Sequence, residues 1–433
     1  MNRYKSYKEV NLPWLKEVPS HWDVKPNKSF LKLSKEVVGN KEKEYELLSL
    51  SKQGVRIKGN NDFSGKMPES FKNYQIVKPG QLIMCLFDLD ISAVFSGLSN
   101  YYGKITSAYN VYDIKNADKK YIEYYFKYIF QDRKYKVFSK TVRYTITNDE
   151  FKNIKSLIPP LPEQIQIASF LDWKINEIDR LIQVEKKKIK ELNHIKQLSI
   201  SFEYKKVIKK IRLKMLLSEP LLYGINGTGK TDGSIRFIRI TDINKDGELK
   251  ENNCLYFDNS DNKFLLKKGD ILFARSGTVG KSYIHKSENM KMCFAGYLIR
   301  ARLDTEIVIP EFVYLYTQSA DYEKWKESIS IQSTIQNISA EKYANLQIPF
   351  VDKIEQKNII QHLRKIINTI EKCKVIISKK IKELELLKQS LISEVVTGKI
   401  DVRNIAIPEY EKATILYDEI EEFDEKEEIE GGN

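Results

Sequence analysis

An internal repeat constrains the fold of this 433-residue chain more than any other feature of its sequence. At an offset of 192 positions, without a gap, Lys188–Leu192 and Lys380–Leu384 are identical, and Glu163–Gln164 falls on Glu355–Gln356. A repeat of this length indicates one structural unit used twice, because self-similarity at a fixed period reflects architecture.

The repeated unit has a globular part followed by a long helix. Upstream of the identical segments, Lys78–Ile83 resembles Lys267–Leu272, and Thr145–Ile146 resembles Thr334–Ile335. The repeat therefore extends into the globular part of each copy.

The globular parts are predicted to mix strands and helices. Short alternating runs between Gly, Asn and Asp clusters predict strands over Glu46–Leu50, Ile235–Ile240 and Asp270–Phe273. Aromatic-rich amphipathic segments predict one helix at the matching place in each copy, over Lys119–Phe130 and Pro310–Tyr322. The predicted fold class is α+β.

Apolar residues that recur every three or four positions predict two long helices with a coiled-coil seam. They are Leu171, Ile175, Ile178, Ile182, Ile189 and Leu192 in the first copy, and Leu363, Ile367, Ile370, Ile377, Ile381, Leu384 and Leu391 in the second. Pro159, Pro160 and Pro162 mark the first helix start, and Gly398 is a stop for the second.

These helices of about 35 to 45 residues would be about 55 to 65 Å long, and we expect them to act as spacers. We expect the two apolar stripes to be buried against each other, because this covers both within one chain. The alternative is that each stripe packs on its own globular part.

Composition and charge indicate several domains and an anionic partner. A chain of this length with 42% hydrophobic residues can bury more than one core. The net charge is +13, and Glu409–Asn433 carries −9, so the remainder carries +22. This balance favours nucleic acid, acidic lipid or acidic protein without choosing among them. No stretch resembles a signal peptide or a membrane span, so we expect a soluble, cytoplasmic protein.

Scattered cysteines and histidines argue against a metal site or a disulfide framework. The cysteines are Cys85, Cys254, Cys293 and Cys373, and the histidines are His21, His194, His285 and His362, none of them in a C-x-x-C or comparable pair. Reduced, mostly buried thiols are the expected state.

One segment, Gly224–Thr231, matches the phosphate-binding pattern G-x-x-x-x-G-K-[ST]. A working phosphate loop needs a hydrophobic strand before it and a helix directly after it. Ser218–Pro220 precedes this segment, and the strand-like Ile235–Ile240 follows it, so a nucleotide hydrolase is a minor alternative and a flexible loop is expected.

No arrangement of residues predicts catalysis. Asp242 with Glu248 is the only spacing that suggests a metal-dependent nuclease, and such spacings are common in a chain with 59 acids. Motifs for adenosylmethionine binding and base amination are absent from the sequence. No catalytic, metal or cofactor residues are therefore predicted.

Loops that mix basic, amide and hydroxyl side chains favour DNA recognition, since Arg and Lys match guanine edges and Asn and Gln match adenine. The candidate DNA-binding residues are Lys52, Gln53, Arg56, Lys140, Arg143, Arg275, Ser276, Thr278, Lys281, Gln332 and Gln336. For any one of them, an ordinary polar loop is the alternative.

Three segments resemble the specificity subunits of type I restriction-modification systems. They are Pro13–Val24, Ile158–Gln164 at the start of the first long helix, and Leu391–Arg403 at the end of the second. With the twofold layout, the resemblance covers nearly the whole chain. The second copy departs from the first where Ile348–Gln356 is two residues longer than Ile158–Gln164.

The resemblance implies two target recognition domains that each read half of a bipartite double-stranded DNA target. It implies that the two spacer helices form an antiparallel coiled-coil pair and that the two copies have a pseudo-twofold arrangement. It also implies that modification subunits, usually two, dock on the helices, and that separate motor subunits cleave DNA. Adenosylmethionine, ATP and magnesium would be used only by these partners, and this chain would be non-catalytic.

The expected domains are a first recognition domain (1–157), a first spacer helix (158–204), a second recognition domain (205–347), a second spacer helix (348–400) and an acidic tail (401–433). A different class is also open: a coiled-coil scaffold whose domains bind protein and not DNA. Steep weakening of binding by salt would favour DNA.

Overall fold

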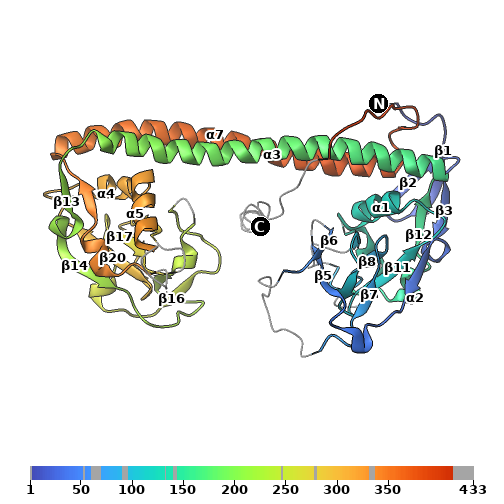
Figure 1. The fold of residues 1–433 in the computed structure, drawn as a ribbon, viewed down its shortest axis with the longest axis horizontal. Helices are drawn as coiled ribbons and strands as arrows, with labels where there is room; N and C mark the ends of the chain where they lie inside the picture. Colours follow the sequence, from blue (N-terminus) through green and yellow to red (C-terminus); the bar gives the residue numbers. More distant parts are fainter. Residues whose placement is uncertain are drawn as a thin grey trace. The chain divides into compact units, whose positions relative to one another are not determined.

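The computed structural model of the protein describes residues 2–51, 54–59, 70–89, 96–131, 133–139, 144–244, 247–276, 280–330 and 337–412. They form two compact units (Figure 1). The first unit contains the residues up to Gln183 and those from Ile381 onward, and the second contains Val184–Lys380. Each long helix contributes one half to each unit.

The first unit has two four-stranded sheets, an antiparallel one of order β4-β11-β8-β9 and a mixed one of order β6-β5-β10-β7. Their bounds are β4 (Leu31–Ser34), β5 (Glu46–Ser51), β6 (Gly54–Ile57), β7 (Gln75–Val77), β8 (Leu82–Met84), β9 (Ser96–Leu98), β10 (Gly103–Ile105) and β11 (Asn110–Ile114). The remaining elements are the hairpin β1 (Tyr7–Leu12) and β2 (Leu15–Pro19), the pair β3 (Asp23–Pro26) and β12 (Lys155–Ile158), and the helices α1 (Lys119–Gln131) and α2 (Asn148–Phe151).

The second unit has a matching antiparallel four-stranded sheet of order β14-β20-β17-β18, and a mixed sheet of three strands, β16-β15-β19, where the first unit has four. Its strands are β13 (Lys210–Arg212), β14 (Leu217–Tyr223), β15 (Ile235–Ile238), β16 (Leu255–Phe257), β17 (Ile271–Ala274), β18 (Ser282–Ile284), β19 (Met292–Phe294), β20 (Leu298–Leu303) and β21 (Gln347–Pro349). Its short helices are α4 (Pro310–Tyr316), α5 (Ala320–Ser330) and α6 (Ala340–Ala344).

The predicted α+β repeat is confirmed by this correspondence. In the mixed sheets, β5 pairs in parallel with β10, and β15 pairs in parallel with β19. Both units also pair the strand that precedes the long helix with a strand from the start of the unit, β12 with β3 and β21 with β13. Such matching non-local pairings indicate one fold used twice.

A polar turn before the central strand is built alike in both units. The Lys78 N–H donates to the Gln81 side chain, and the Lys267 N–H donates to the Asp270 carboxylate, both at 2.7 Å. The two turns place glycines at φ +83° and +91°, where a side chain would be strained. The predicted match of Lys78–Ile83 with Lys267–Leu272 is therefore structural.

The predicted match of Thr145–Ile146 with Thr334–Ile335 has the wrong register. The Ile146 N–H bonds the Leu86 carbonyl at the end of β8, and the Ile338 N–H bonds the Arg275 carbonyl at the end of β17. Ile338 is thus the equivalent of Ile146, and the offset of 192 also holds here. The earlier pair, Thr334–Ile335, lies outside the described residues.

The helix predicted over Pro310–Tyr322 is two helices, so that prediction is wrong. α4 ends at Tyr316, where the Thr317 hydroxyl donates to the Tyr314 carbonyl at 2.6 Å. The Ser319 hydroxyl then accepts from the Tyr322 N–H at 3.1 Å and starts α5. Side-chain hydroxyls that bond local backbone groups compete with helix continuation.

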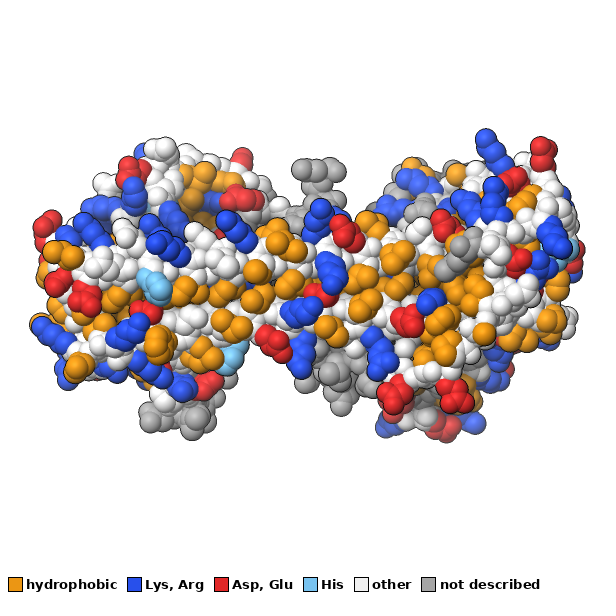
Figure 2. Space-filling model, turned by 90° about the horizontal axis from the view of Figure 1, so that it is seen from above, with side chains coloured by type: hydrophobic (Ala, Val, Ile, Leu, Met, Phe, Trp, Pro, Cys, Tyr) orange, Lys and Arg blue, Asp and Glu red, His pale blue; other side chains and the backbone are white. Residues whose placement is uncertain are grey.

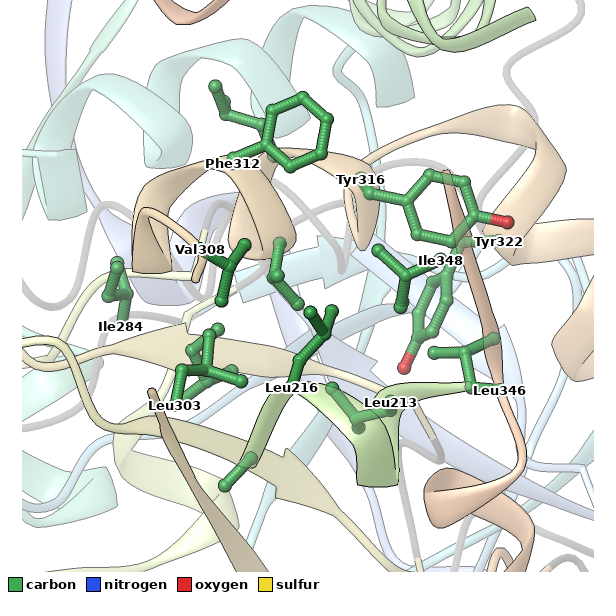
Figure 3. Close-up of a cluster of buried hydrophobic side chains, with 14 of the residues drawn as sticks. Leu213, Leu216, Ile284, Leu303, Val308, Phe312, Tyr316, Tyr322, Leu346 and Ile348 are labelled. Carbon is green, nitrogen blue, oxygen red and sulfur yellow. The ribbon is translucent and has the colours of Figure 1, made fainter. Parts of the chain in front are cut away.

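The core of the second unit gathers side chains from its sheet, its short helices and both long helices (Figure 3). Leu213 and Leu216 precede β14, Phe312 and Tyr316 come from α4, and Tyr322 comes from α5. The Tyr204 hydroxyl of the first long helix donates to the Phe312 carbonyl at 2.5 Å. The C-terminal end of α3 is thereby fixed to the globular part of the second unit.

The long helices α3 (Leu161–Lys205) and α7 (Lys353–Val396) form an antiparallel pair within each unit. In the second unit Lys380 pairs with Glu185 and Lys196 with Glu371, and in the first unit Lys388 pairs with Asp179. Every predicted seam residue is buried or half-buried. At 1.5 Å per residue, 45 residues give about 68 Å. α7 ends close to the predicted stop Gly398, which has φ +72°.

A buried glutamine ties the start of each long helix to its unit. The Gln164 carboxamide accepts from the Asp118 N–H at 2.8 Å and donates to the Pro159 carbonyl at 2.7 Å. Gln356 makes the same contacts with the Ile309 N–H and the Val351 carbonyl, both at 2.8 Å. The residues aligned at the offset of 192 are thus equivalent in three dimensions.

Glu163, in the segment that starts α3, binds the segment Pro13–Val24. This buried carboxylate accepts from the Trp22 indole at 2.9 Å, contacts the His21 ring at 2.7 Å, and accepts from the Tyr4 hydroxyl. Burial, together with the bond to the carboxylate, raises the pKa of Tyr4. The Tyr7 hydroxyl donates to the Gly398 carbonyl at 3.0 Å, so the segment after α7 packs on the same hairpin.

Replacing Glu163 with Leu should destabilise the first unit by about 2 to 4 kcal/mol, because the indole, hydroxyl and imidazole would lose a buried acceptor. Urea unfolding followed by tryptophan fluorescence would measure the loss. The matched control is Glu355→Leu, the equivalent change at an exposed side chain, which should cost less than about 1 kcal/mol. Equal losses for the two variants would contradict this role for Glu163.

Candidate nucleic-acid interface

In the second unit, the cationic residue Arg275 lies at the end of strand β17. The Arg275 N–H bonds the Tyr297 carbonyl at 2.9 Å, and the Arg275 carbonyl accepts from the Ile338 N–H at 2.9 Å. Tyr297 is 64% exposed, so this strand end lies at the surface. The backbone of Arg275 is therefore held on both sides where the strand meets solvent.

The Arg275 side chain is held in place by two residues from distant parts of the chain. Its guanidinium carbon lies 5.2 Å from the centre of the Tyr223 ring, and its Nε donates to the Asn337 side chain at 3.2 Å. The Tyr223 hydroxyl in turn accepts from the Ala340 N–H at 2.9 Å. Among the described residues, the Nη1 and Nη2 donors of Arg275 have no hydrogen-bond partner. They are available to a ligand.

Two other predicted DNA-binding residues lie beside Arg275 in the β17–β18 hairpin. Ser276 follows it and is half-buried. Lys281 starts the return, where its carbonyl accepts from the Ala274 N–H at 2.8 Å and its amine donates to the Ile243 carbonyl at 2.5 Å. The structure therefore brings Arg275, Ser276 and Lys281 together, and their role in binding stays a prediction.

Of the predicted residues in the first unit, the structure describes Arg56. It lies in β6 opposite Ser49 of β5 and is half-buried. The other predicted residues, Lys52, Gln53, Lys140, Arg143, Thr278, Gln332 and Gln336, lie outside the described residues. Sequence reasoning missed Tyr223 as a support for Arg275, and no local pattern joins positions 223, 275 and 337.

The corresponding strand end of the first unit has different chemistry. Leu86 stands where Arg275 stands in the second unit, and its side chain is buried. The next residue, Phe87, stacks on Tyr109 with ring centres 6.1 Å apart. Nearby, the Lys136 amine lies 4.1 Å from the centre of the Tyr144 ring. One fold therefore presents a guanidinium in one unit and an aromatic pair in the other.

Buried cations of the second unit are neutralised internally. Arg302 pairs with Asp270 and Glu219, and Arg300 pairs with Glu219 at 2.7 Å. The hydrogen bond to Arg302 lowers the pKa of Glu219, so this carboxylate stays charged. In the first unit the corresponding pair is Gln81 with Asp113. These arginines hold the sheet together and are not presented to a ligand.

The Gly224–Thr231 segment lacks the structure of a phosphate loop. The expectation that no strand precedes it is wrong, because β14 runs up to Tyr223. No helix follows, however, since Lys230 exchanges backbone hydrogen bonds with Tyr256, at 2.9 and 2.8 Å. The Lys230 amine pairs with Asp258 at 2.9 Å, which raises the pKa of the lysine. The segment is part of a sheet edge and not a flexible loop.

The acidic and cysteine side chains that could take part in metal or redox chemistry are paired with other residues or lie apart from one another. Asp242 is buried and pairs with Arg239 at 2.7 Å, which raises the pKa of the arginine. Within the described ranges, no three His, Cys, Asp or Glu side chains are grouped as a metal site. All four cysteines are free thiols, and Cys85 and Cys293 are buried.

The long helices also present apolar side chains to solvent. On α3 these are Leu181, Val184, Ile195, Leu198 and Phe202, and on α7 they are Val375, Ile376, Leu386 and Leu387. Figure 2 shows such side chains along the helix pair, between lysines and acids. In the second unit a groove of about 570 Å³ is lined by Leu198, Phe202, His362 and Ile366, among others. Exposed apolar surface of this kind indicates a protein-binding site.

The described helices include none with the length and apolar character required to cross a bilayer.

Comparison with known proteins identifies the family. The model for the type I restriction modification DNA specificity domain matches residues 20–194 and 226–386, so the chain belongs to this family and carries the domain twice. A curated relative, the type I restriction enzyme MjaVIII specificity subunit of Methanocaldococcus jannaschii, is 25% identical over 281 residues. The match covers 59% of this chain and 64% of the relative, which is less than two thirds of its length.

A solved structure described as the structural basis underlying complex assembly and conformational transition of the type I R-M system shows the same fold, with a TM-score of 0.59 and 13% identity. That match covers 88% of this chain and 99% of the other. The HsdS subunit from Thermoanaerobacter tengcongensis matches with a TM-score of 0.40 and 14% identity, over 88% of this chain and 98% of the other.

We expect titration calorimetry with MgATP to detect no binding to the wild-type chain or to Lys230→Ala, because no helix N-terminus faces this lysine. The variant tests the one sequence match to a nucleotide-binding loop. Saturable binding by the wild-type chain that Lys230→Ala abolishes would contradict this expectation and revive the hydrolase alternative.

Proposed function

We propose that this chain is the non-catalytic DNA specificity subunit of a type I restriction-modification complex, with each globular part reading one half of a bipartite target. The observation that carries the proposal is one fold used twice with different side chains at the equivalent strand end, Arg275 and Ser276 in one copy and Leu86 and Phe87 in the other. Two domains that share a fold but present different side chains suit a DNA target whose two halves differ in sequence.

Charge distribution supports double-stranded DNA as the ligand. The chain has 72 Lys and Arg against 59 Asp and Glu, and Glu409–Asn433 carries a net charge of −9, so the remainder is more basic than the whole. Exposed lysines would contact phosphates and supply affinity, and a few side chains at the strand ends would supply sequence choice. Arg56, Arg275, Ser276 and Lys281 are the described candidates for these contacts.

The helix pair supports a second role, docking of modification subunits on its exposed apolar side chains. These side chains alternate with charged ones along both helices, an arrangement that fits a protein interface with an apolar centre and a polar rim. The partners would bind adenosylmethionine, methylate adenine and, in a motor subunit, use ATP and magnesium. This chain would hold no cofactor of its own.

Mapping adenine methylation in DNA from cells that express this chain with its modification subunit tests the proposed function. We expect one bipartite motif, of which one half changes when residues 205–347 are exchanged for those of a relative. Exchange of residues 1–157 is the matched control and should change the other half alone. A stable complex that methylates no motif would instead favour the protein-binding scaffold.

Docking is tested by Phe202→Asp, because a charge at this 64% exposed side chain would have to be desolvated in an apolar interface. We expect affinity for the modification subunit, measured by calorimetry, to fall at least about 30-fold. Met215→Asp is the control, an equally exposed apolar residue outside the long helices, and it should have little effect. Equal affinity of the two variants would remove this face of α3 from the interface.

A further inference from the structure

We infer that Arg275 reads a guanine in the major groove of the half-site bound by the second unit, with Tyr223 and Asn337 as positioning residues. The inference rests on the proposed function and assigns one base of the target to one side chain. It follows from how the guanidinium is held and from which of its donors are used.

The geometry of Arg275 leaves one edge of its guanidinium for a ligand. A guanidinium has five N–H donors in a planar fork. The Nε donor is occupied by Asn337 at 3.2 Å, and the plane is fixed by the Tyr223 ring at 5.2 Å. Among the residues that the structure describes, Nη1 and Nη2 have no hydrogen-bond acceptor.

An arginine held in this way suits a base edge more than a phosphate. A flexible lysine is enough to bind a phosphate, so holding the Arg275 side chain in one orientation would add little to phosphate binding. The O6 and N7 atoms of guanine are two acceptors side by side in the major groove, and they match two N–H groups of one guanidinium. No other base presents two adjacent acceptors there, since adenine pairs its N7 with a donor.

Position in the fold explains why the contact belongs to one half-site. Arg275 is fixed at the end of β17 by backbone bonds to Tyr297 and Ile338, so its Cα cannot shift without breaking these two hydrogen bonds. In the first unit the equivalent residue is Leu86, which has no donor in its side chain. We therefore expect this guanine in the half-site that the second unit reads. Leu86 cannot make the same contact in the other half-site.

Among the described residues, no carboxylate pairs with Arg275, in contrast to four other arginines of the same unit. Arg236, Arg239, Arg300 and Arg302 of the same unit each pair with a carboxylate, at Glu251, Asp242 and Glu219 or Asp270. Arg275 has an amide and a ring as its partners, so its charge is not neutralised.

The test combines the methylation motif with modified DNA, and it uses the complete complex. Once the motif is known, each guanine of the second half is replaced in turn by 7-deazaguanine, which lacks the N7 acceptor. We expect wild-type affinity to fall about 5- to 150-fold at one guanine and little at the others. The variant Arg275→Gln should bind the natural and the modified site about equally.

Four further variants separate positioning from general damage. Arg275→Lys keeps the charge but not the fork, and it should relax the preference at the same base pair. Tyr223→Leu should relax it too, whereas Tyr223→Phe keeps the ring and should retain it. Arg212→Gln removes an equally positive but exposed side chain of β13, and it should leave the motif unchanged.

The outcomes distinguish the inference from the proposed function. If the wild-type complex methylates no motif, the proposed function fails. A bipartite motif whose second half contains no G·C pair overturns the inference alone. So does a second half in which every 7-deazaguanine is tolerated by the wild-type protein.

Discussion

A buried glutamine at the start of each long helix is the contact on which the arrangement within each unit depends. Gln164 and Gln356 lie in the long helices, and each joins its helix to two other segments. The carboxamide accepts from a backbone N–H just before a helix of the globular part, and it donates to a carbonyl of the segment that leads into the long helix. Both side chains are at most 1% exposed, so a lost partner would leave a polar group unsatisfied at a cost of about 1 to 3 kcal/mol. The spacer helix is thereby set rigidly on its recognition fold.

The two units share this arrangement of strands and helices. They differ at positions where one pair of hydrogen-bonding side chains can replace another and still join the same two strands. Gln81 with Asp113 in the first unit becomes Asp270 with Arg302 in the second, so the same two strands are joined by an amide pair or by an ion pair. In both units the side chain at the turn also accepts the same backbone N–H, which preserves the turn. This arrangement is the same in both units, whereas the residue at the strand end differs, a buried Leu86 in the first unit and Arg275 in the second.

The helix pair combines a buried seam with an exposed apolar face. Residues such as Ile178 and Ile370 are buried, whereas Phe202 and Val375 are largely exposed on the same helices. A helix that were only a spacer would gain nothing from these exposed side chains, which favour association. Glu163 adds an asymmetry, because Trp22, between β2 and β3, binds this carboxylate at the start of α3, whereas the equivalent Glu355 on α7 is exposed.

The sequence by itself determined the repeat, the fold class, the two long helices and their seam, because these follow from local periodicity and from identity at a fixed offset. It also determined that residues near Arg275 are candidates for DNA binding. Two features were not evident from the sequence: the end of α4 at the Thr317 hydroxyl, and the strand that precedes Gly224. Hydrogen bonds to specific neighbours outweigh local propensity at both places. Only the tertiary structure placed Tyr223 and Asn337 on either side of Arg275, since these residues lie far apart in the chain and meet through sheet pairing.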